Sequence, residues 1–318
     1  MEPTTNGRRP LWLDGATATE LQRAGLAVDG PWWTVRALNG EPNRTKLRAV
    51  QRAHLEAGAD VLTANTFRCN LRTLRRIGLD AAGLAWMVHA AVGVAQSARE
   101  QARRPDAVIA ASMAPVEDCY RPDLVPPADE LAAEHAWLVT EARRSGVELF
   151  LIETMNTERE ARTALAAALA GGGRAWVSFV CGPDGLLPSG ERVGDAAAAA
   201  ERDGAEAVLV NCTALADVPA ALDRLRERCS GPIGVAPNLE DRGSLGRWEH
   251  TDRALPAAVG PDEFAELMAG WRDRYGLDVL GGCCGTTPDH LAAARALIGA
   301  GAGPSAGSVA GSVAEPAG

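Results

Sequence analysis

A short pattern recurs four times along the 318-residue chain and limits what the chain can fold into. In each copy a glycine is followed by one residue, then an acid, then an apolar run. The copies are GADVLTANTF at 58–67, GVELFLIETM at 146–155, GAEAVLVNCT at 204–213 and GLDVLGGCC at 276–284. Glycine at the end of a helix takes the left-handed conformation at little cost, and a short loop then leads into a strand. The pattern therefore predicts repeated helix-to-strand units.

Further apolar runs bring the number of candidate strands to eight. They lie at 11–15, 107–113, 175–181 and 233–238. The runs are continuous rather than alternating, which is typical of parallel strands buried on both faces. Eight such units in a chain of this length predict a single (β/α)8 TIM barrel. An open doubly wound sheet is the competing fold, but no G-x-G-x-x-G motif follows any of the runs.

The boundaries of this barrel follow from composition along the chain. We expect residues 1–10 to form a flexible N-terminus and residues 11–298 to form the barrel. Residues 299–318 contain mainly Gly, Ala, Ser and Pro, which predicts a disordered tail. The segments 114–130 and 238–262 are rich in Pro, Gly and charge. We expect both to be long loops that follow strands, on the catalytic face of the barrel.

Composition and charge restrict the partners and the compartment. The formal net charge is −9 and no basic stripe is present, which argues against nucleic acid or an anionic membrane as a partner. No apolar run is expected to span a bilayer, and the N-terminus lacks the apolar region of a signal peptide. Seven cysteines without framework spacing fit a reducing compartment. We therefore predict a cytoplasmic protein that acts on small molecules, with the oligomeric state open and a monomer favoured.

Polar residues close most of the predicted strands. In a barrel these positions meet around one mouth, where catalytic groups of such enzymes lie. Burying that many polar groups at random would be costly, so their convergence predicts a site. The residues are Asp14, Asn65, Thr66, Glu153, Asn211, Cys212, Asn238, Cys283 and Cys284.

The adjacent pair Cys283 and Cys284 needs its own explanation. The pair lacks the C-x₂₋₄-C spacing of a structural zinc knuckle, and a disulfide between neighbours would be strained. The two residues therefore fill space, carry out redox chemistry or share a metal with a ligand from elsewhere. Cys212 ends the sixth predicted strand, and three thiolates could hold one Zn²⁺ with the fourth position open, as in catalytic sites. Flanking glycines would let both neighbouring sulfurs face one ion.

The remaining cysteines lack such context. We expect buried apolar thiols at Cys69, Cys119, Cys181 and Cys229.

The chain resembles the homocysteine S-methyltransferase family in an ordered set of motifs that covers residues 11 to about 298. The matching stretches are LDGATATEL at 13–21, GADVLTANTF at 58–67, IETM at 152–155, VNCT at 210–213, PN at 237–238 and GGCCGTTPDH at 281–290. The resemblance implies a zinc site formed by Cys212, Cys283 and Cys284. It also implies that Asp14, Gly15 and Glu153 bind the amino-acid part of homocysteine.

Other candidate substrate-binding residues have a plausible structural role as well. Asn65, Thr66 and Asn238 follow strands, where amides and hydroxyls often only hold loops. Trp33 in PWWTVRAL could offer an aromatic face to a sulfonium methyl group, although such residues are more often part of the core. His290 follows TTPD, which predicts a helix start and makes this histidine a helix residue rather than a fourth ligand.

The function implied by the resemblance is zinc-dependent methyl transfer in methionine biosynthesis. A sulfonium donor, S-methylmethionine or S-adenosylmethionine, would methylate the thiolate of L-homocysteine to give L-methionine. Another small thiol or selenol acceptor, a non-catalytic zinc- or thiol-binding barrel, and a redox cysteine pair are the alternatives. The chain departs from the family at Thr17, in the loop APVEDCY at 114–120 and at 239–241. These departures affect the donor side more than the zinc and acceptor residues.

Overall fold

The computed structural model describes residues 9–30, 32–243, 245–246, 248–249 and 253–301. Most of the predicted flexible N-terminus and the predicted tail from residue 302 onward lie outside this range. Eight parallel strands form one sheet, each within one of the predicted runs or offset from it by a single residue. They are β1 (Leu11–Trp12), β2 (Val61–Ala64), β3 (Val108–Met113), β4 (Leu149–Met155), β5 (Arg174–Phe179), β6 (Ala207–Ala214), β7 (Ile233–Asn238) and β8 (Val279–Leu280).

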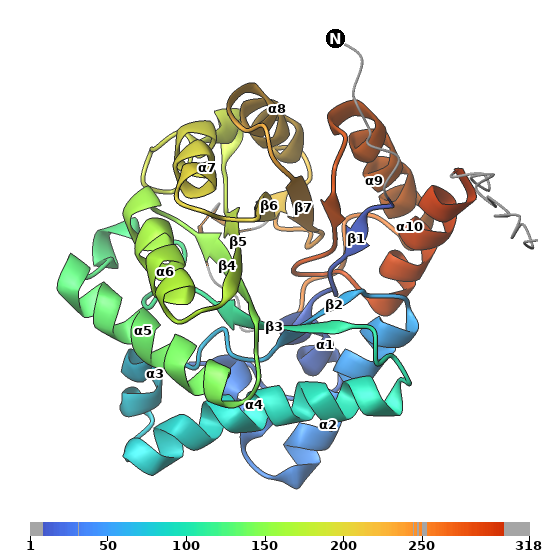
Figure 1. The fold of residues 1–318 in the computed structure, drawn as a ribbon. Helices are drawn as coiled ribbons and strands as arrows, with labels where there is room; N and C mark the ends of the chain where they lie inside the picture. Colours follow the sequence, from blue (N-terminus) through green and yellow to red (C-terminus); the bar gives the residue numbers. More distant parts are fainter. Residues whose placement is uncertain (1–8, 31, 244, 247, 250–252, 302–318) are drawn as a thin grey trace, which may run out of the picture.

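The sheet curls into a barrel (Figure 1). Its strand order is β1-β8-β7-β6-β5-β4-β3-β2, with every neighbouring pair parallel. A parallel bridge between Leu13 and Val61 joins β1 to β2 at the remaining edge. The Leu13 amide also donates to the Leu280 carbonyl of β8 at 2.8 Å. The predicted (β/α)8 barrel is therefore confirmed.

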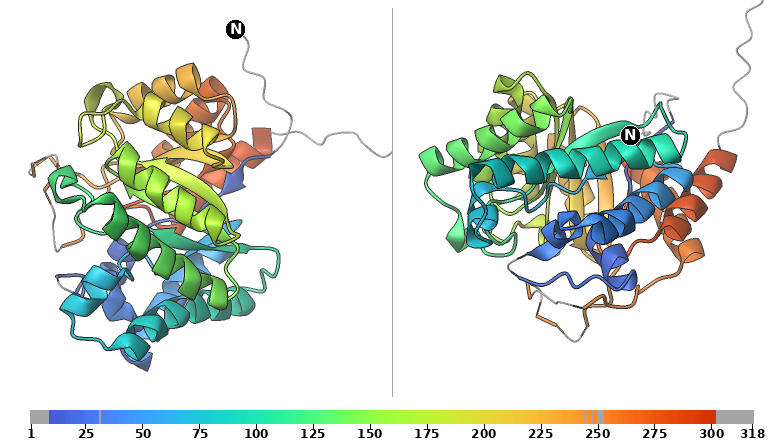
Figure 2. Two further views of the ribbon diagram at one scale, coloured as in Figure 1. Left: turned by 60° about the vertical axis from the view of Figure 1, so that its left-hand side comes forward. Right: turned by 90° about the horizontal axis from the view of Figure 1, so that it is seen from below.

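Helices surround the strands as an outer layer (Figure 2). The helices are α1 (Thr17–Arg23), α2 (Glu41–Glu56), α3 (Leu71–Arg76), α4 (Ala81–Gln101), α5 (Ala128–Arg144), α6 (Glu158–Ala170), α7 (Val193–Arg202), α8 (Val218–Arg228), α9 (Pro261–Tyr275) and α10 (Pro288–Gly301), with short 3₁₀ turns η1 (Trp33–Leu38), η2 (Pro122–Leu124) and η3 (Pro183–Gly185). The last helix, α10, extends three residues past 298.

Two apolar cores explain why the strand runs do not alternate. On β6, Leu209 belongs to a small cluster inside the barrel, together with residues such as Leu151 and Trp176. Its neighbours Val208 and Val210 belong to the larger core between the strands and the helices. Both faces of the strand are thus apolar and buried, as expected for a parallel sheet.

The repeated glycine and acid both have roles at the amino-terminal end of the barrel. The glycines of the four copies all adopt positive φ angles, between 60° and 107°. Two of the four acids bind backbone amides of neighbouring elements. Asp60 accepts from the Trp12 amide and pairs with Arg104 and Arg295, and Asp278 accepts from the Ile233 amide. The recurring pattern therefore fixes the strand starts, away from the strand ends where the site lies.

The expectation that no apolar run could span a bilayer was too strict. Helix α4 has 21 residues and is long and apolar enough to do so by length and composition alone. In the structure, however, Leu84, Val88 and Val92 are among its eight buried residues. The helix contacts α2 and α5 and covers the barrel. We therefore interpret its apolar character as that of a core helix.

Candidate metal centre and substrate pocket

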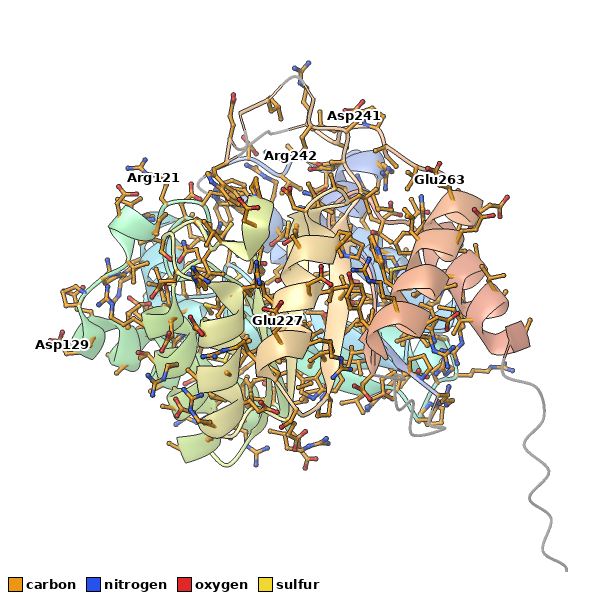
Figure 3. The ribbon with its side chains drawn as sticks, turned by 90° about the horizontal axis from the view of Figure 1, so that it is seen from above. Arg121, Asp129, Glu227, Asp241, Arg242 and Glu263 are labelled. Carbon is orange, nitrogen blue, oxygen red and sulfur yellow. The ribbon has the colours of Figure 1, made fainter. Side chains whose placement is uncertain are left out.

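A pocket opens at the carboxyl ends of the strands. It has a volume of about 210 Å³ and is lined by residues from all parts of the barrel sequence. The two long loops predicted for this face both contribute, Cys119 and Tyr120 from one and Glu240 and Arg242 from the other. Figure 3 shows Arg242 at the same end of the barrel as Arg121, which lies in the loop after β3.

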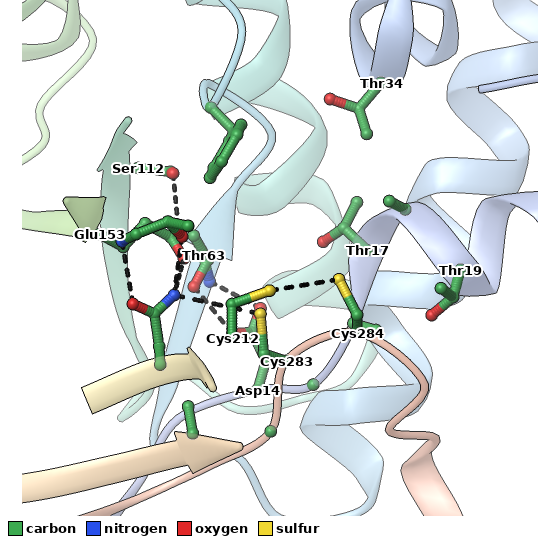
Figure 4. A pocket seen from close by; sticks show the side chains of 18 of the residues that line it. Asp14, Thr17, Thr19, Thr34, Thr63, Ser112, Glu153, Cys212, Cys283 and Cys284 are labelled. Atoms are coloured by element: carbon green, nitrogen blue, oxygen red, sulfur yellow. Dashed lines mark hydrogen bonds between the residues drawn. The ribbon is translucent and has the colours of Figure 1, made fainter. Parts of the chain in front are cut away.

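The sulfur atoms of Cys212, Cys283 and Cys284 meet in this pocket (Figure 4). All three lie within 4.8 Å of one another, and the Cys212 and Cys284 Sγ atoms are 3.6 Å apart. No disulfide joins them. A tetrahedral ion with zinc–sulfur bonds of about 2.3 Å would place its sulfur ligands roughly 3.8 Å apart. The cluster therefore fits a metal ion held by three thiolates.

Irregular strand ends bring neighbouring residues onto the same side. The pairing of β6 with β7 shifts between Asn211 and Ala214, and Cys212 has a φ of 51°. The pairing of β4 with β5 shifts in the same way, and Thr154 has a φ of 59°. Such positive φ angles are unusual for residues with a Cβ atom, and bulges re-aim side chains. As a result Asn211 and Cys212 both line the pocket, where a regular strand would separate them.

The cysteine pair lies in a turn just beyond β8. The Cys283 amide donates to the Pro237 carbonyl at 3.0 Å, and the Cys284 carbonyl accepts from the Leu239 amide at 2.8 Å. Gly285 follows with a φ of 81°, and a Cβ atom there would lie 2.9 Å from the Glu240 nitrogen. Glycine at this position therefore lets the turn pack against the end of β7.

Polar groups around the Cys212 sulfur favour its thiolate form, whereas the interaction with Cys212 raises the pKa values of Cys283 and Cys284. Tyr120 and Cys212 form a hydrogen bond of 3.6 Å between Oη and Sγ, and the Asn238 amide donates to Cys212 at 3.8 Å. Hydrogen bonds from the Cys283 and Cys284 thiols hold the pKa of Cys212 well below its usual range. The Asn211 amide lies 4.0 Å from the Cys283 sulfur. Such outer hydrogen bonds orient ligands and tune a metal site.

Asp14 connects the pocket to the barrel wall. Its carboxylate accepts from the Thr63 amide at 2.8 Å and from the Thr63 hydroxyl at 2.7 Å. Burial raises its pKa to about 6, against the lowering effect of these hydrogen bonds. Asp14 therefore lines the pocket and also ties β1 to β2.

Glu153 lies across the barrel from Asp14, at the end of β4. Its two oxygens accept from the Ser112 hydroxyl and, at 3.3 Å, from the Asn211 amide. Burial raises its pKa to about 8, and the nearby charge of Asp14 adds to the shift. Two desolvated carboxyl groups beside three cysteines make a pocket that favours cationic ligands.

The other predicted binding residues have mixed positions. Gly15 lines the pocket, and a Cβ there would meet the ring of buried His54 at 2.5 Å. Asn65 also lines the pocket, but its side-chain amide donates to the Thr34 carbonyl at 2.8 Å and so holds η1 in place. The Thr66 hydroxyl donates to the Ser112 carbonyl at 2.8 Å, and Thr66 does not line the pocket.

Two predicted side chains make contacts that bear on their expected roles. Trp33 lines the pocket, and the Arg68 guanidinium lies 5.3 Å from the centre of its ring. His290 bonds with Thr287 at 2.7 Å and with the Val259 carbonyl at 3.1 Å, in the first turn of α10. His290 is therefore a helix residue outside the cysteine cluster, as predicted.

Sequence reasoning missed several pocket residues. Tyr120 and Arg242 lie in the two loops predicted for the catalytic face, but nothing in their local sequence singles them out. Thr63 on β2 and Arg68 after it flank the predicted residues Asn65 and Thr66, which directly follow this strand. Alternation along a strand could have identified Thr63, whereas the contacts of Arg68 depend on the tertiary fold.

Comparisons with known proteins place the chain in one family. The model of the family described as homocysteine S-methyltransferase matches residues 11–298. The chain belongs to the homocysteine S-methyltransferase family. The predicted family is thus confirmed, and so is the prediction that the chain is a methyltransferase enzyme.

Individual relatives match the chain over most of its length. The chain is 27% identical to homocysteine S-methyltransferase YbgG of Bacillus subtilis, over 88% of this chain and 91% of that protein. The crystal structure of the metallated homocysteine methyltransferase MmuM of Escherichia coli superposes with a TM-score of 0.77 and 26% identity, covering 92% of this chain and 97% of that chain. The chain is also 28% identical to methionine synthase of Mycobacterium leprae, but it spans only 25% of that protein's length.

We expect each of Cys212→Ser, Cys283→Ser and Cys284→Ser to remove a tightly bound metal ion, from about one ion per chain to roughly a tenth of that, because a hydroxyl is a poor ligand for an ion held by thiolates. Metal content of purified protein, measured by mass spectrometry, tests this. Cys229→Ser is the control, since Cys229 ends α8 at the opposite end of the barrel. Full metal content in any of the three cluster variants would contradict the assignment.

We expect Gly285→Ala to weaken zinc binding about tenfold or more, because the added methyl group would displace the turn that carries Cys284. Gly78→Ala is a matched control. Its φ is 79°, close to the 81° of Gly285, but a Cβ there meets nothing within 4 Å. Both variants should lose about 1 kcal/mol of stability from the left-handed backbone. Competition with a chromogenic chelator measures affinity, and equal affinity in the two variants would refute the steric role.

We expect the contribution of Asp14 to the free energy of unfolding to fall as the pH rises. Its pKa is about 6 when folded against 3.8 as the reference value, so the folded state binds more protons between these values. The unfolding free energy of the wild type relative to Asp14→Asn should therefore fall by on the order of 3 kcal/mol from pH 4 to pH 7. Urea unfolding of metal-free, reduced protein measures this difference. A difference that does not vary with pH would show that Asp14 titrates normally.

Proposed function

We propose that the protein transfers a methyl group from a sulfonium donor, S-methylmethionine or S-adenosylmethionine, to the thiolate of L-homocysteine, giving L-methionine. The observation that carries this proposal is the meeting of three cysteine sulfurs with two buried carboxyl groups in one pocket. The family to which the chain belongs acts on the same acceptor by name. Cytoplasmic location remains our expectation for such an enzyme.

Zinc is the metal that we propose for Cys212, Cys283 and Cys284. Three thiolates with an open fourth position are typical of catalytic zinc. Bound there, zinc would lower the pKa of a substrate thiol so that it is a nucleophile near neutral pH. The amides of Asn238 and Asn211 would keep the cysteine sulfurs charged and oriented.

The amino-acid part of the acceptor would be held by Asp14, Glu153 and the backbone near Gly15. An ammonium group placed between the two carboxyl groups would offset the hydration energy that each loses on burial. The pKa of Glu153 is raised to about 8, so an arriving ammonium would displace its proton and leave a charged pair. Holding the acceptor at this end would direct its thiol to the cluster, and much of the rate gain would come from this positioning.

A second acceptor class, a small thiol or selenol such as selenocysteine, is the alternative. The loops at 114–120 and 239–241 depart from the family and border the pocket through Tyr120 and Glu240. A different acceptor would use the same metal centre and the same carboxyl groups.

We expect zinc-loaded protein to form methionine from L-homocysteine with at least one of S-methylmethionine and S-adenosylmethionine, followed by mass spectrometry. Selenocysteine as acceptor and betaine as donor complete the set. Cys283→Ser should lower the rate by about 100-fold or more, because the thiol then loses its activating ion. Cys229→Ser should retain the wild-type rate. If product forms only with selenocysteine, the acceptor is a selenol and not homocysteine. If no pair of donor and acceptor gives a methylated product, the proposal is overturned.

A further inference from the structure

Arg68, between β2 and α3, is a buried cation that lines the pocket. Only 6% of its surface is exposed. Among the residues that the structure describes, no Asp or Glu forms an ion pair with it, although Asp14, Glu153 and Glu240 line the same pocket. Burying a charge without an opposite charge is costly. Such a cation is therefore poised to receive an anionic group of a ligand.

The hydrogen bonds of Arg68 leave most of its donors free. Nη1 donates to the Glu117 carbonyl at 2.8 Å, and Nη2 lies 3.9 Å from the Cys119 sulfur. Nε is buried and has no partner. A guanidinium has about five N–H donors in one plane, so its edge can still form a paired contact with a carboxylate.

Two aromatic rings hold the guanidinium in place. Its central carbon lies 5.3 Å from the centre of the Trp33 ring and 5.0 Å from that of Phe67. Both aromatic residues also line the pocket. Stacked rings favour a cation at their faces and leave the in-plane N–H groups available. The same aromatic surface would attract the positive charge of a sulfonium.

The acceptor already has a binding group for each of its charges in the proposed function. Its ammonium would contact Asp14 and Glu153, and its carboxylate the backbone near Gly15. Among the residues that the structure describes, Arg68 contacts Glu117, Cys119 and the two aromatic rings, and it forms no hydrogen bond or ion pair with Asp14, Gly15 or Glu153. Resting on the proposed function, we infer that Arg68 binds the carboxylate of the methyl donor, so that the enzyme selects sulfonium compounds that also carry a carboxylate.

Donors that differ only in this group test the inference. S-methylmethionine and its carboxamide would be compared with L-homocysteine as acceptor, in the wild type, Arg68→Gln and Arg68→Lys. Arg68→Gln should lower kcat/KM for S-methylmethionine by about 10- to 100-fold, the usual effect of losing a charge-assisted hydrogen bond. It should change kcat/KM for the carboxamide by less than about threefold, and Arg68→Lys should restore part of the loss.

Arg76→Gln on α3 is the matched control, because Arg76 is exposed and pairs with Glu117 outside the pocket. It should behave like the wild type with both donors. Equal losses for the two donors in Arg68→Gln would overturn the inference. So would a rise in the KM for homocysteine instead of the donor, which would assign Arg68 to the acceptor. If Arg68→Gln does not fold, the wild type alone still tests the inference. Equal kcat/KM values for S-methylmethionine and its carboxamide would overturn it.

A binding measurement separates this inference from the proposed function. Calorimetric titration of S-methylmethionine and its carboxamide into metal-free protein needs no methyl transfer. Tighter binding of the carboxylate form, lost in Arg68→Gln and kept in Arg76→Gln, would support the inference even if no product forms in any assay. Equal affinities for the two compounds in the wild type would overturn it even if methionine is formed.

Discussion

The closure of the barrel at β1 is the constraint on which the site depends. This strand is only two residues long, yet it joins β8 on one side and, through Leu13, β2 on the other. The next residue, Asp14, continues both connections, because its carbonyl accepts from the Gly282 amide and its carboxylate accepts from Thr63. Residues that are far apart in sequence, at the two ends of the chain, thus become neighbours. Without this closure Asp14 and the cysteine pair would lie on separate edges of an open sheet.

The electrostatic character of the pocket follows from what surrounds its acids. Asp14 and Glu153 have raised pKa values chiefly because burial removes water from them. Nearby sulfurs add negative charge, while Arg242 is paired with Glu240. Among the residues that the structure describes, neither Asp14 nor Glu153 forms an ion pair, and Arg68 lies against Trp33 and Phe67 instead. The pocket can therefore offer its two acids to the positive group of a ligand and Arg68 to a carboxylate.

The fold and the clustering of the three cysteines could be predicted because their signals are local. Gly58 and Gly204 end helices, the apolar runs mark strands, and the adjacent cysteines have few structural explanations. The irregular ends of β4 and β6 could not be predicted, since a bulge depends on the pairing of two strands and not on the residues of one. Arg68 was missed for a similar reason. Its burial and its contacts with Trp33 and Phe67 arise only when separate segments pack.

The two ends of the barrel have different tasks, and this division has a consequence for how such a protein can change. The glycines and acids that start the strands, with the arginines that bind them, hold the amino-terminal end together. The three clustered cysteines, Asp14 and Glu153 are anchored directly to strand ends on the opposite side. Tyr120 and Arg242, in contrast, belong to long loops whose length and composition are not fixed by the strands. The residues that these loops bring to the pocket can therefore change, while the barrel and its strand-end cysteine cluster are inherited intact.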